Sequence, residues 1–66
     1  MIIKVNNENV EVEDNTTVSQ LIDRMQLATG GLAVACNGVI VKRGEWSAHR
    51  LKPDDDILLI KAAYGG

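Results

Sequence analysis

The sequence of 66 residues contains one cysteine, Cys36, and one histidine, His49. A single cysteine excludes an intramolecular disulfide. One cysteine and one histidine also fall short of the four ligands of a structural zinc site. A domain of this size buries only about 60% of the surface of its unfolded chain, and it lacks the cross-links that small domains commonly use. Its stability must therefore come from regular packing.

Long apolar runs and an excess of basic charge are also missing. No apolar segment approaches the roughly 20 residues of a transmembrane helix, and no basic segment followed by an apolar one opens the chain as in a signal peptide. The formal net charge is −2, with both signs scattered, which argues against a nucleic-acid-binding protein. The composition favours one soluble cytoplasmic domain over residues 1–66, with no metal and no cofactor.

Two β-hairpins are predicted, one in each half of the chain. The first joins residues 1–5 to residues 10–13 through an asparagine-rich turn of four residues, since asparagine tolerates left-handed backbone conformations. The second joins residues 32–36 to residues 39–41 through Asn37-Gly38. An Asn-Gly pair is the strongest short hairpin signal, because both central residues of a type I′ turn need positive φ.

A single helix is predicted between the hairpins. Thr17 and Gln20 have the spacing of a capping box. The apolar residues that follow the cap at helical spacing, and that predict one buried face, are Val18, Leu21, Ile22 and Met25. We expect about three turns, ending before Gly30-Gly31, because glycine suits the left-handed position after a helix.

Residues 57–61 (ILLIK) predict a final strand. If Ile57 and Leu59 face the helix, Leu58 and Ile60 face solvent. Two exposed aliphatic side chains next to the chain end predict a docking patch for a partner. The alternative is that they are ordinary scattered apolar residues of a protein surface.

The other chemistry-bearing residues are more simply explained by structural roles. His49 has no Ser or Asp partner suggested by the sequence, and Cys36 lies in an apolar strand as an inert core thiol. The acidic residues 54–56 are adjacent and point apart, so they predict a solvated turn rather than a Mg²⁺ site. Trp46, in the connecting residues 42–50, is expected to cover the edge of the core.

Residues 62–66 (AAYGG) predict a projecting tail. Glycine has no Cβ, so Gly65-Gly66 could enter a channel too narrow for any other residue and present the α-carboxylate of Gly66 there. A strand followed by such a thin stalk favours a protein that another protein acts on. The alternative is a frayed end with two accidental glycines.

The order strand, strand, helix, strand, strand, connector, strand resembles the α+β ubiquitin-like β-grasp fold. That fold is a mixed sheet of about five short strands packed on one helix, here with a flexible C-terminal tail. Over essentially the whole chain the sequence is similar to one family with this fold, the thiamine-biosynthesis sulfur carrier proteins (ThiS). The motifs are residues 17–21 (TVSQL), 34–38 (VACNG), 41–46 (VKRGEW), 54–57 (DDDI) and Gly65-Gly66. The family often has proline at Lys42 and an aliphatic residue at Cys36, and Tyr64 is bulky for its position.

The resemblance implies a protein cosubstrate and not an enzyme. A ThiF-like activating enzyme would adenylate the Gly66 carboxylate with ATP. Sulfur from a cysteine desulfurase would then give a thiocarboxylate, which a ThiG-like thiazole synthase would use. Tyr64, Gly65 and Gly66 would enter the partner's channel, and Leu58 and Ile60 would form the docking surface.

Three other functions stay open at this point. The molybdopterin synthase small subunit is also a β-grasp sulfur carrier with a Gly-Gly end, but it tends to be longer. A ubiquitin-like modifier joined to lysines of target proteins would share the chemistry as far as the adenylate. A β-grasp binding module would have the same fold and an inert tail.

Overall fold

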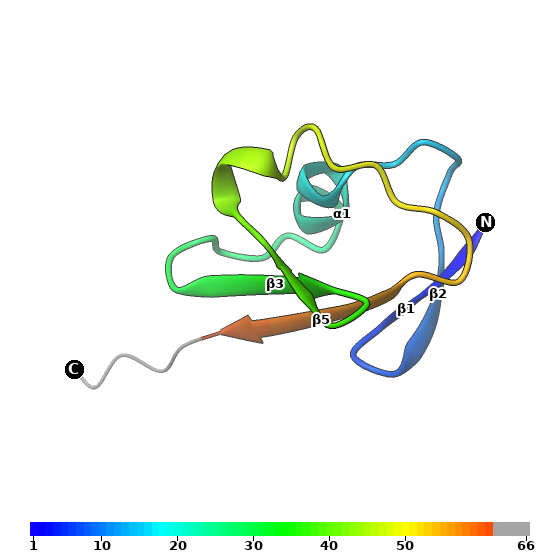
Figure 1. The fold of residues 1–66 in the computed structure, drawn as a ribbon, viewed down its shortest axis with the longest axis horizontal. Coiled ribbons are helices and arrows are strands. Elements are labelled where there is room, and N and C mark those ends of the chain that lie inside the picture. Colours follow the sequence, from blue (N-terminus) through cyan, green and yellow to red (C-terminus); the bar gives the residue numbers. More distant parts are fainter. Residues whose placement is uncertain (62–66) are drawn as a thin grey trace.

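A computed structural model describes residues 1–61, and the tail of residues 62–66 lies outside the described residues. The described chain forms five strands, one α-helix and one 3-10 turn (Figure 1). In chain order these are β1 (Ile2–Val5), β2 (Glu8–Glu11), α1 (Val18–Arg24), β3 (Leu32–Cys36), β4 (Val39–Val41), η1 (Arg43–Glu45) and β5 (Asp56–Lys61). This order is the one that the sequence predicts.

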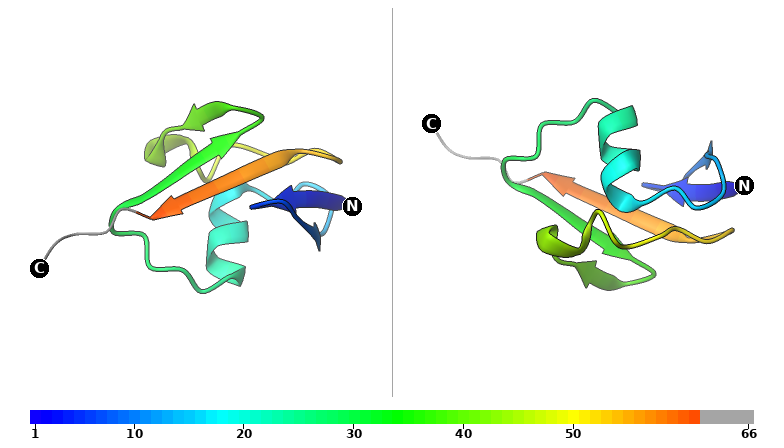
Figure 2. Two further views of the ribbon diagram at one scale, coloured as in Figure 1. Left: turned by 90° about the horizontal axis from the view of Figure 1, so that it is seen from below. Right: turned by 90° about the horizontal axis from the view of Figure 1, so that it is seen from above.

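The five strands of the described residues form one mixed sheet in the order β2-β1-β5-β3-β4. The first and last strands in the chain, β1 and β5, are parallel neighbours inside the sheet, and the other neighbouring pairs are antiparallel. Helix α1 covers one face of this sheet (Figure 2). The predicted β-grasp architecture is therefore confirmed. In residues 1–61 no helix is long and apolar enough to cross a membrane.

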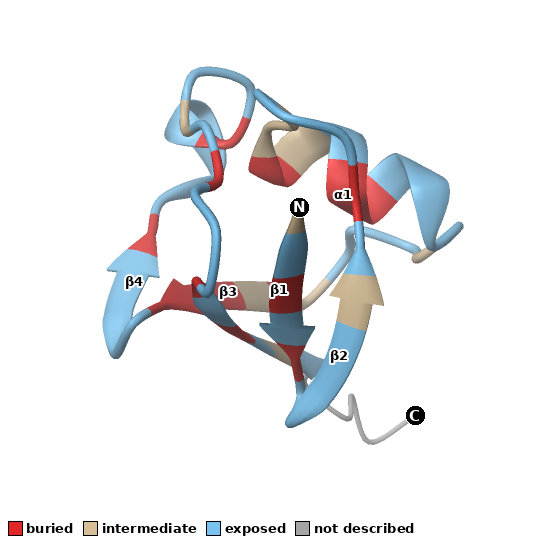
Figure 3. Cartoon of the chain, turned by 90° about the vertical axis from the view of Figure 1, so that its right-hand side faces the viewer, coloured by how far each residue is buried: buried red, intermediate tan, exposed pale blue. Residues whose placement is uncertain are grey.

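The core lies between α1 and the inner face of the sheet (Figure 3). Ile3, Val34 and Ile57 contribute fully buried side chains from three central strands. Val18 and Leu21 meet them from the helix and are also fully buried. Each such aliphatic side chain contributes about 1.5–3 kcal/mol when it leaves water. In a chain without a disulfide, this layer supplies the main favourable term of folding.

The first hairpin is tighter than the sequence predicts. Its turn is Asn6-Asn7 alone, with φ values of 50° and 69°, and Val5 pairs directly with Glu8. A two-residue turn with positive φ at both positions matches the twist of its strands, and asparagine adopts it at little cost. The predicted strand at residues 10–13 was therefore wrong by two positions. The second hairpin, at Asn37-Gly38, is confirmed by φ values of 52° and 83°.

The start of helix α1 is confirmed, but its predicted length is wrong. Thr17 Oγ1 accepts a hydrogen bond from the Gln20 N–H (3.2 Å), and Gln20 Oε1 accepts one from the Thr17 N–H (2.9 Å), which completes the capping box. The helix has seven residues, about two turns. Gln26 takes the left-handed conformation with φ of 56° and ends it before Gly30-Gly31. Met25, predicted to be buried, is 39% exposed.

The connector after β4 closes one end of the core. Its Trp46 is buried, and the indole Nε1–H donates to the Val41 carbonyl (2.9 Å). The Arg43 guanidinium lies 5.3 Å from the centre of the indole ring, within the range of a cation–π contact. The backbone carbonyl of His49 accepts from the Val18 N–H (3.0 Å) at the start of α1. The prediction that Trp46 covers the edge of the core is confirmed. The backbone of His49 has a structural role, because its carbonyl accepts the hydrogen bond at the start of α1.

Candidate functional site

The predicted docking residues lie on the sheet face opposite the helix. In β5 the side chains alternate: Ile57 is fully buried, while Leu58 and Ile60 are 47% and 49% exposed. Leu58 is paired with Ala35 of β3, and Ile60 is paired with Ala33. The predicted exposure of both residues is confirmed. Their role in docking stays a prediction.

Strand β4 extends this apolar surface beyond the two residues that the sequence predicts. Ile40 is paired with Ala35 and is 62% exposed. One row across three strands therefore holds Ile40, Ala35 and Leu58, and the next row holds Ala33 and Ile60. We call these five residues the outer apolar face. The sequence could have predicted that Ile40 lies on this face, because a two-residue Asn37-Gly38 turn fixes which residues of the hairpin share a face.

Polar residues limit the outer apolar face on the β1 side. Lys4 of β1 is paired with Asp56 of β5, and Asn9 of β2 is paired with Lys4. Ile2 is also exposed, but the pairing of Lys4 with Asp56 separates it from Leu58. An apolar centre with a polar rim is the usual anatomy of a protein interface.

Strand β5 is held firmly at its start by the turn of the second hairpin. The Asn37 N–H donates to the Asp56 carbonyl (2.8 Å), and the Asp56 N–H donates to Asn37 Oδ1 (2.9 Å). Farther along, the Leu59 N–H donates to Asn6 Oδ1 (2.8 Å). The strand that precedes residues 62–66 is thus central in the sheet and bonded on both sides. It can serve as a rigid base for whatever follows Lys61.

Asp55 corrects the prediction that residues 54–56 form a wholly solvated turn. Its side chain is buried, and its two carboxylate oxygens accept from Asn37 Nδ2 (3.0 Å) and from the Lys52 N–H (2.8 Å). A buried carboxylate is tolerated when its oxygens are hydrogen-bonded, so Asp55 is a structural link between the turn and the second hairpin. Among residues 1–61, no three His, Cys, Asp or Glu side chains gather as a metal site.

Cys36 lies beside this buried carboxylate. Burial of the thiol, and secondarily the negative charge and hydrogen bond of Asp55, raise the pKa of Cys36 above its ordinary value. The thiolate is the reactive form of cysteine, so the environment suppresses reactivity. The structure agrees with the interpretation of Cys36 as an inert core thiol.

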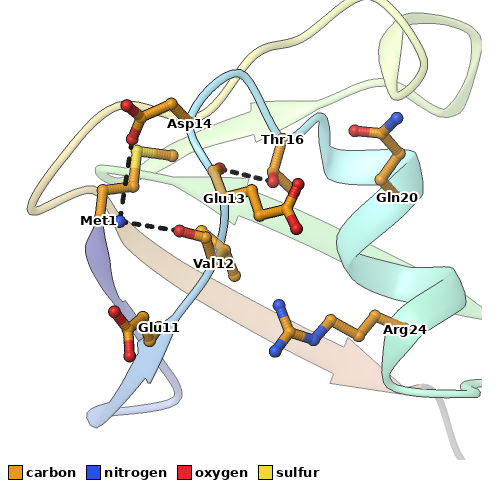
Figure 4. A pocket seen from close by; sticks show the side chains of 8 residues that line it. All are labelled: Met1, Glu11, Val12, Glu13, Asp14, Thr16, Gln20 and Arg24. Carbon is orange, nitrogen blue, oxygen red and sulfur yellow. Dashed lines mark hydrogen bonds and ion pairs between the residues drawn. The ribbon is translucent and has the colours of Figure 1, made fainter.

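A shallow cleft opens between the end of β2 and helix α1 (Figure 4). The Met1 amino group donates to the Val12 carbonyl (2.8 Å) and lies 3.8 Å from the Asp14 carboxylate. The Arg24 side chain extends into the cleft from α1 (Figure 4). These contacts fasten the first residue to the loop before the helix. The cleft is open and is lined by polar and apolar side chains together.

Comparison with known proteins assigns the chain to a family. Residues 3–66 match the family model described as "ThiS family". The chain belongs to the ThiS family. A curated relative of Escherichia coli (strain K12), named "Sulfur carrier protein ThiS", is 32% identical over 66 residues, which cover the whole of both chains.

Solved structures of ThiS proteins share the fold of this ThiS family member. The crystal structure of the thiamine biosynthesis protein (ThiS) from Geobacter metallireducens superposes with a TM-score of 0.87, at 23% identity and with full coverage of both chains. A solution structure of a thiamine biosynthesis protein from the same organism gives a TM-score of 0.80 at 23% identity. It covers all of this chain and 88% of that one. These likenesses support the ubiquitin-like β-grasp fold.

The predicted tail residues Tyr64, Gly65 and Gly66 lie outside the described residues, so their roles stay predictions. The match to the family model nevertheless extends to residue 66. The structure places β5, with Leu58 and Ile60 exposed, immediately before this segment. The candidate site therefore joins a described surface to a terminal pair of glycines known from the sequence.

Proposed function

We propose that this ThiS family member is a cytoplasmic sulfur carrier for thiamine biosynthesis, with the sulfur carried on the carboxyl group of Gly66. The observation that carries the proposal is the match of residues 3–66 to the family model, which includes Gly65-Gly66. The full-length similarity to the E. coli sulfur carrier supports it. The chain acts as a protein cosubstrate, and its partners perform the catalysis.

The chemistry needs an activated carboxyl group, because a free carboxylate is a poor electrophile. A Gly66 oxygen attacks the α-phosphate of ATP in a ThiF-like activating enzyme, and pyrophosphate leaves. A persulfide derived from a cysteine desulfurase attacks the acyl carbon and displaces AMP. A second thiol then attacks the desulfurase-derived sulfur of this acyl disulfide, the one not bonded to the acyl carbon, forms a new disulfide with it and releases the thiocarboxylate on Gly66. This sulfur nucleophile is delivered to a ThiG-like thiazole synthase.

The outer apolar face contributes binding energy to these encounters. Fixing the backbone of each residue that enters a partner's channel costs about 1–2 kcal/mol of entropy. Burial of Leu58 and Ile60 against a partner offsets this cost at roughly 25 cal/mol per Å² of apolar surface. Because β5 is anchored at Asn37 and Asn6, docking fixes the point from which Tyr64, Gly65 and Gly66 enter the partner's channel. The chain thus supplies position rather than acid–base groups.

The proposal is tested by isotope exchange between pyrophosphate and ATP, catalysed by the ThiF-like enzyme of the source organism. Exchange should depend on the full chain and should disappear when Gly66 is deleted. The shortened chain should retain the circular dichroism spectrum of the folded protein, since the deletion lies beyond β5. Exchange that persists without Gly66 would contradict the proposal. Isopeptide-linked adducts on target proteins in cells would instead favour a ubiquitin-like modifier.

A further inference from the structure

The two edges of the sheet differ in how they are protected. Strand β2 presents Glu8, Asn9 and Glu11 along its edge. Strand β4 presents Val39 and Ile40, which at 68% and 62% are the most exposed large apolar side chains of the described residues. Natural sheets usually guard their edges with charged side chains, because a free edge is a template for another strand. Strand β4 has no charged side chain along its edge.

The backbone of Ile40 is directed away from the sheet. The Asn37 N–H donates to Asp56 in β5, and hydrogen-bonding direction alternates along an antiparallel strand. Cys36 and Val34 therefore bond to β4, where their partners are Val39 and Val41. Ile40 lies between those two residues, so its N–H and C=O point outward. The edge thus offers one donor and one acceptor on a single apolar residue.

We propose that β4 pairs antiparallel with β4 of a second copy of this chain, about a twofold axis at Ile40. The two Ile40 residues exchange a pair of backbone hydrogen bonds, and their side chains meet on the outer side of the sheet. The two five-stranded sheets then form one continuous sheet. The contact is isologous, as in most small homodimers. This proposal does not depend on the proposed function.

The charge pattern along β4 favours a second copy as the occupant. Lys42, exposed, follows one end of the strand, and the exposed Asp56 of β5 lies beside Asn37 at the other end, joined to it through its backbone N–H and carbonyl. Antiparallel pairing about Ile40 places Lys42 of each copy beside Gly38 of the other. Lys42 then lies toward the acidic end of its neighbour. The edge is thus complementary to itself in charge, and the attraction weakens with salt.

The paired form is weak and leaves the docking residues free. Two three-residue edges bury less than the roughly 1,000 Å² typical of a stable interface, so the dimer forms only at high protein concentration. Leu58 and Ile60 lie on β5, two strands from the edge. They remain exposed in the paired form. Self-association through β4 therefore covers Ile40 of the outer apolar face but leaves Leu58 and Ile60 available to a partner.

Sedimentation velocity from micromolar to millimolar concentration tests the proposal. The sedimentation coefficient should rise with concentration, and the rise should be smaller in high salt. Ile40→Lys places a guarding charge on the edge and should stay monomeric. Leu58→Lys is the matched control, because it places the same side chain on the same face of a central strand. It should keep the concentration dependence of the unmodified chain.

Amide hydrogen exchange of the unmodified chain gives a second readout that needs no substitution. Exchange of the Ile40 amide should slow as the protein concentration rises, while exchange of amides along the β2 edge should not change. A chain that remains monomeric at millimolar concentration would overturn the proposal. So would an Ile40→Lys variant that associates like the unmodified chain, or an Ile40 amide whose exchange is independent of concentration.

Discussion

Asn37 and Asp56 exchange two hydrogen bonds, one between backbone groups (2.8 Å) and one from the Asp56 N–H to the Asn37 side chain (2.9 Å). The same asparagine adopts a φ of 52° in the hairpin turn and donates its amide to the buried Asp55 carboxylate. One residue therefore turns the second hairpin and fixes the start of β5. The position of the strand that carries Leu58 and Ile60 depends on it.

Asn37→Gly should destabilise the protein although glycine suits the turn. The change removes the side-chain acceptor for the Asp56 N–H and leaves the buried Asp55 carboxylate one donor short. We expect a loss of about 1–3 kcal/mol in the free energy of unfolding, measured with urea. Asn7→Gly, at a φ of 69° in the exposed first turn, is the control and should change stability by no more than about 1 kcal/mol. Equal stabilities for the two variants would contradict this role of Asn37.

Leu58→Ser and Ile60→Ser should weaken partner binding and leave the fold intact. Both side chains are about half exposed, so each substitution should lower the free energy of unfolding by only about 1 kcal/mol. Affinity for the ThiF-like enzyme, measured by isothermal titration calorimetry, should fall about tenfold or more. Ile2→Ser changes an equally exposed aliphatic residue beyond the Lys4–Asp56 pair and should bind normally. Unchanged affinity in the Leu58 and Ile60 variants would remove them from the docking surface.

The raised pKa of Cys36 predicts a loss of stability at alkaline pH. Below the pKa of an unfolded thiol, about 8.5, Cys36 is protonated in both the folded and the unfolded chain, and its contribution to the free energy of unfolding is fully present. As the pH rises, the thiol ionises first in the unfolded chain, so the contribution is lost as the pH rises through the folded pKa. Urea unfolding between about pH 7 and 10 should show a steeper decline for the unmodified chain than for Cys36→Ala. Parallel curves would contradict the assignment.

Gln26→Gly should stabilise the end of helix α1. Gln26 has a φ of 56°, a conformation that costs most residues about 1–2 kcal/mol and costs glycine little. Glycine also adds entropy to the unfolded chain, which offsets part of this gain. We therefore expect the free energy of unfolding, measured by thermal unfolding, to rise by up to about 1 kcal/mol. Arg24→Gly, in the last helical turn, should instead destabilise by about 1 kcal/mol. A lower melting temperature for Gln26→Gly than for the unmodified chain would refute this explanation.

The strongest local signals in the sequence predicted the parts of the fold that depend on them. Asn37-Gly38 predicted the second hairpin, Thr17 and Gln20 predicted the start of the helix, and the apolar run of residues 57–61 predicted the last strand. In each case the local preference and the tertiary packing agree. Residues 57–60 are apolar on both faces of the strand, so the sequence predicted the strand, and the exposure of Leu58 and Ile60 followed only if Ile57 and Leu59 faced the helix.

The errors arose where the local signal was ambiguous. Asn6-Asn7 can form a complete two-residue turn, but the following Glu8 and Asn9 also look like turn residues. Nothing in the side chain of Gln26 marks it as the left-handed residue that ends the helix. Burial of Asp55 depends on Asn37, 18 positions away in the chain. Such a contact is visible only when the hairpin and the turn have been brought together.

The central claim is that Gly66 carries the sulfur, and the mass of the C-terminal peptide tests it most directly. The chain is incubated with ATP, cysteine and an extract of its source, beside a copy that lacks Gly66, and both are digested. The peptide that ends in Gly66 should become heavier by the difference between sulfur and oxygen, and the shortened peptide should not. Oxidation of Met1 or Met25 gives nearly the same shift, so the added mass must be located on the C-terminal peptide. An unchanged C-terminal peptide in an extract that converts a known ThiS protein would contradict the claim.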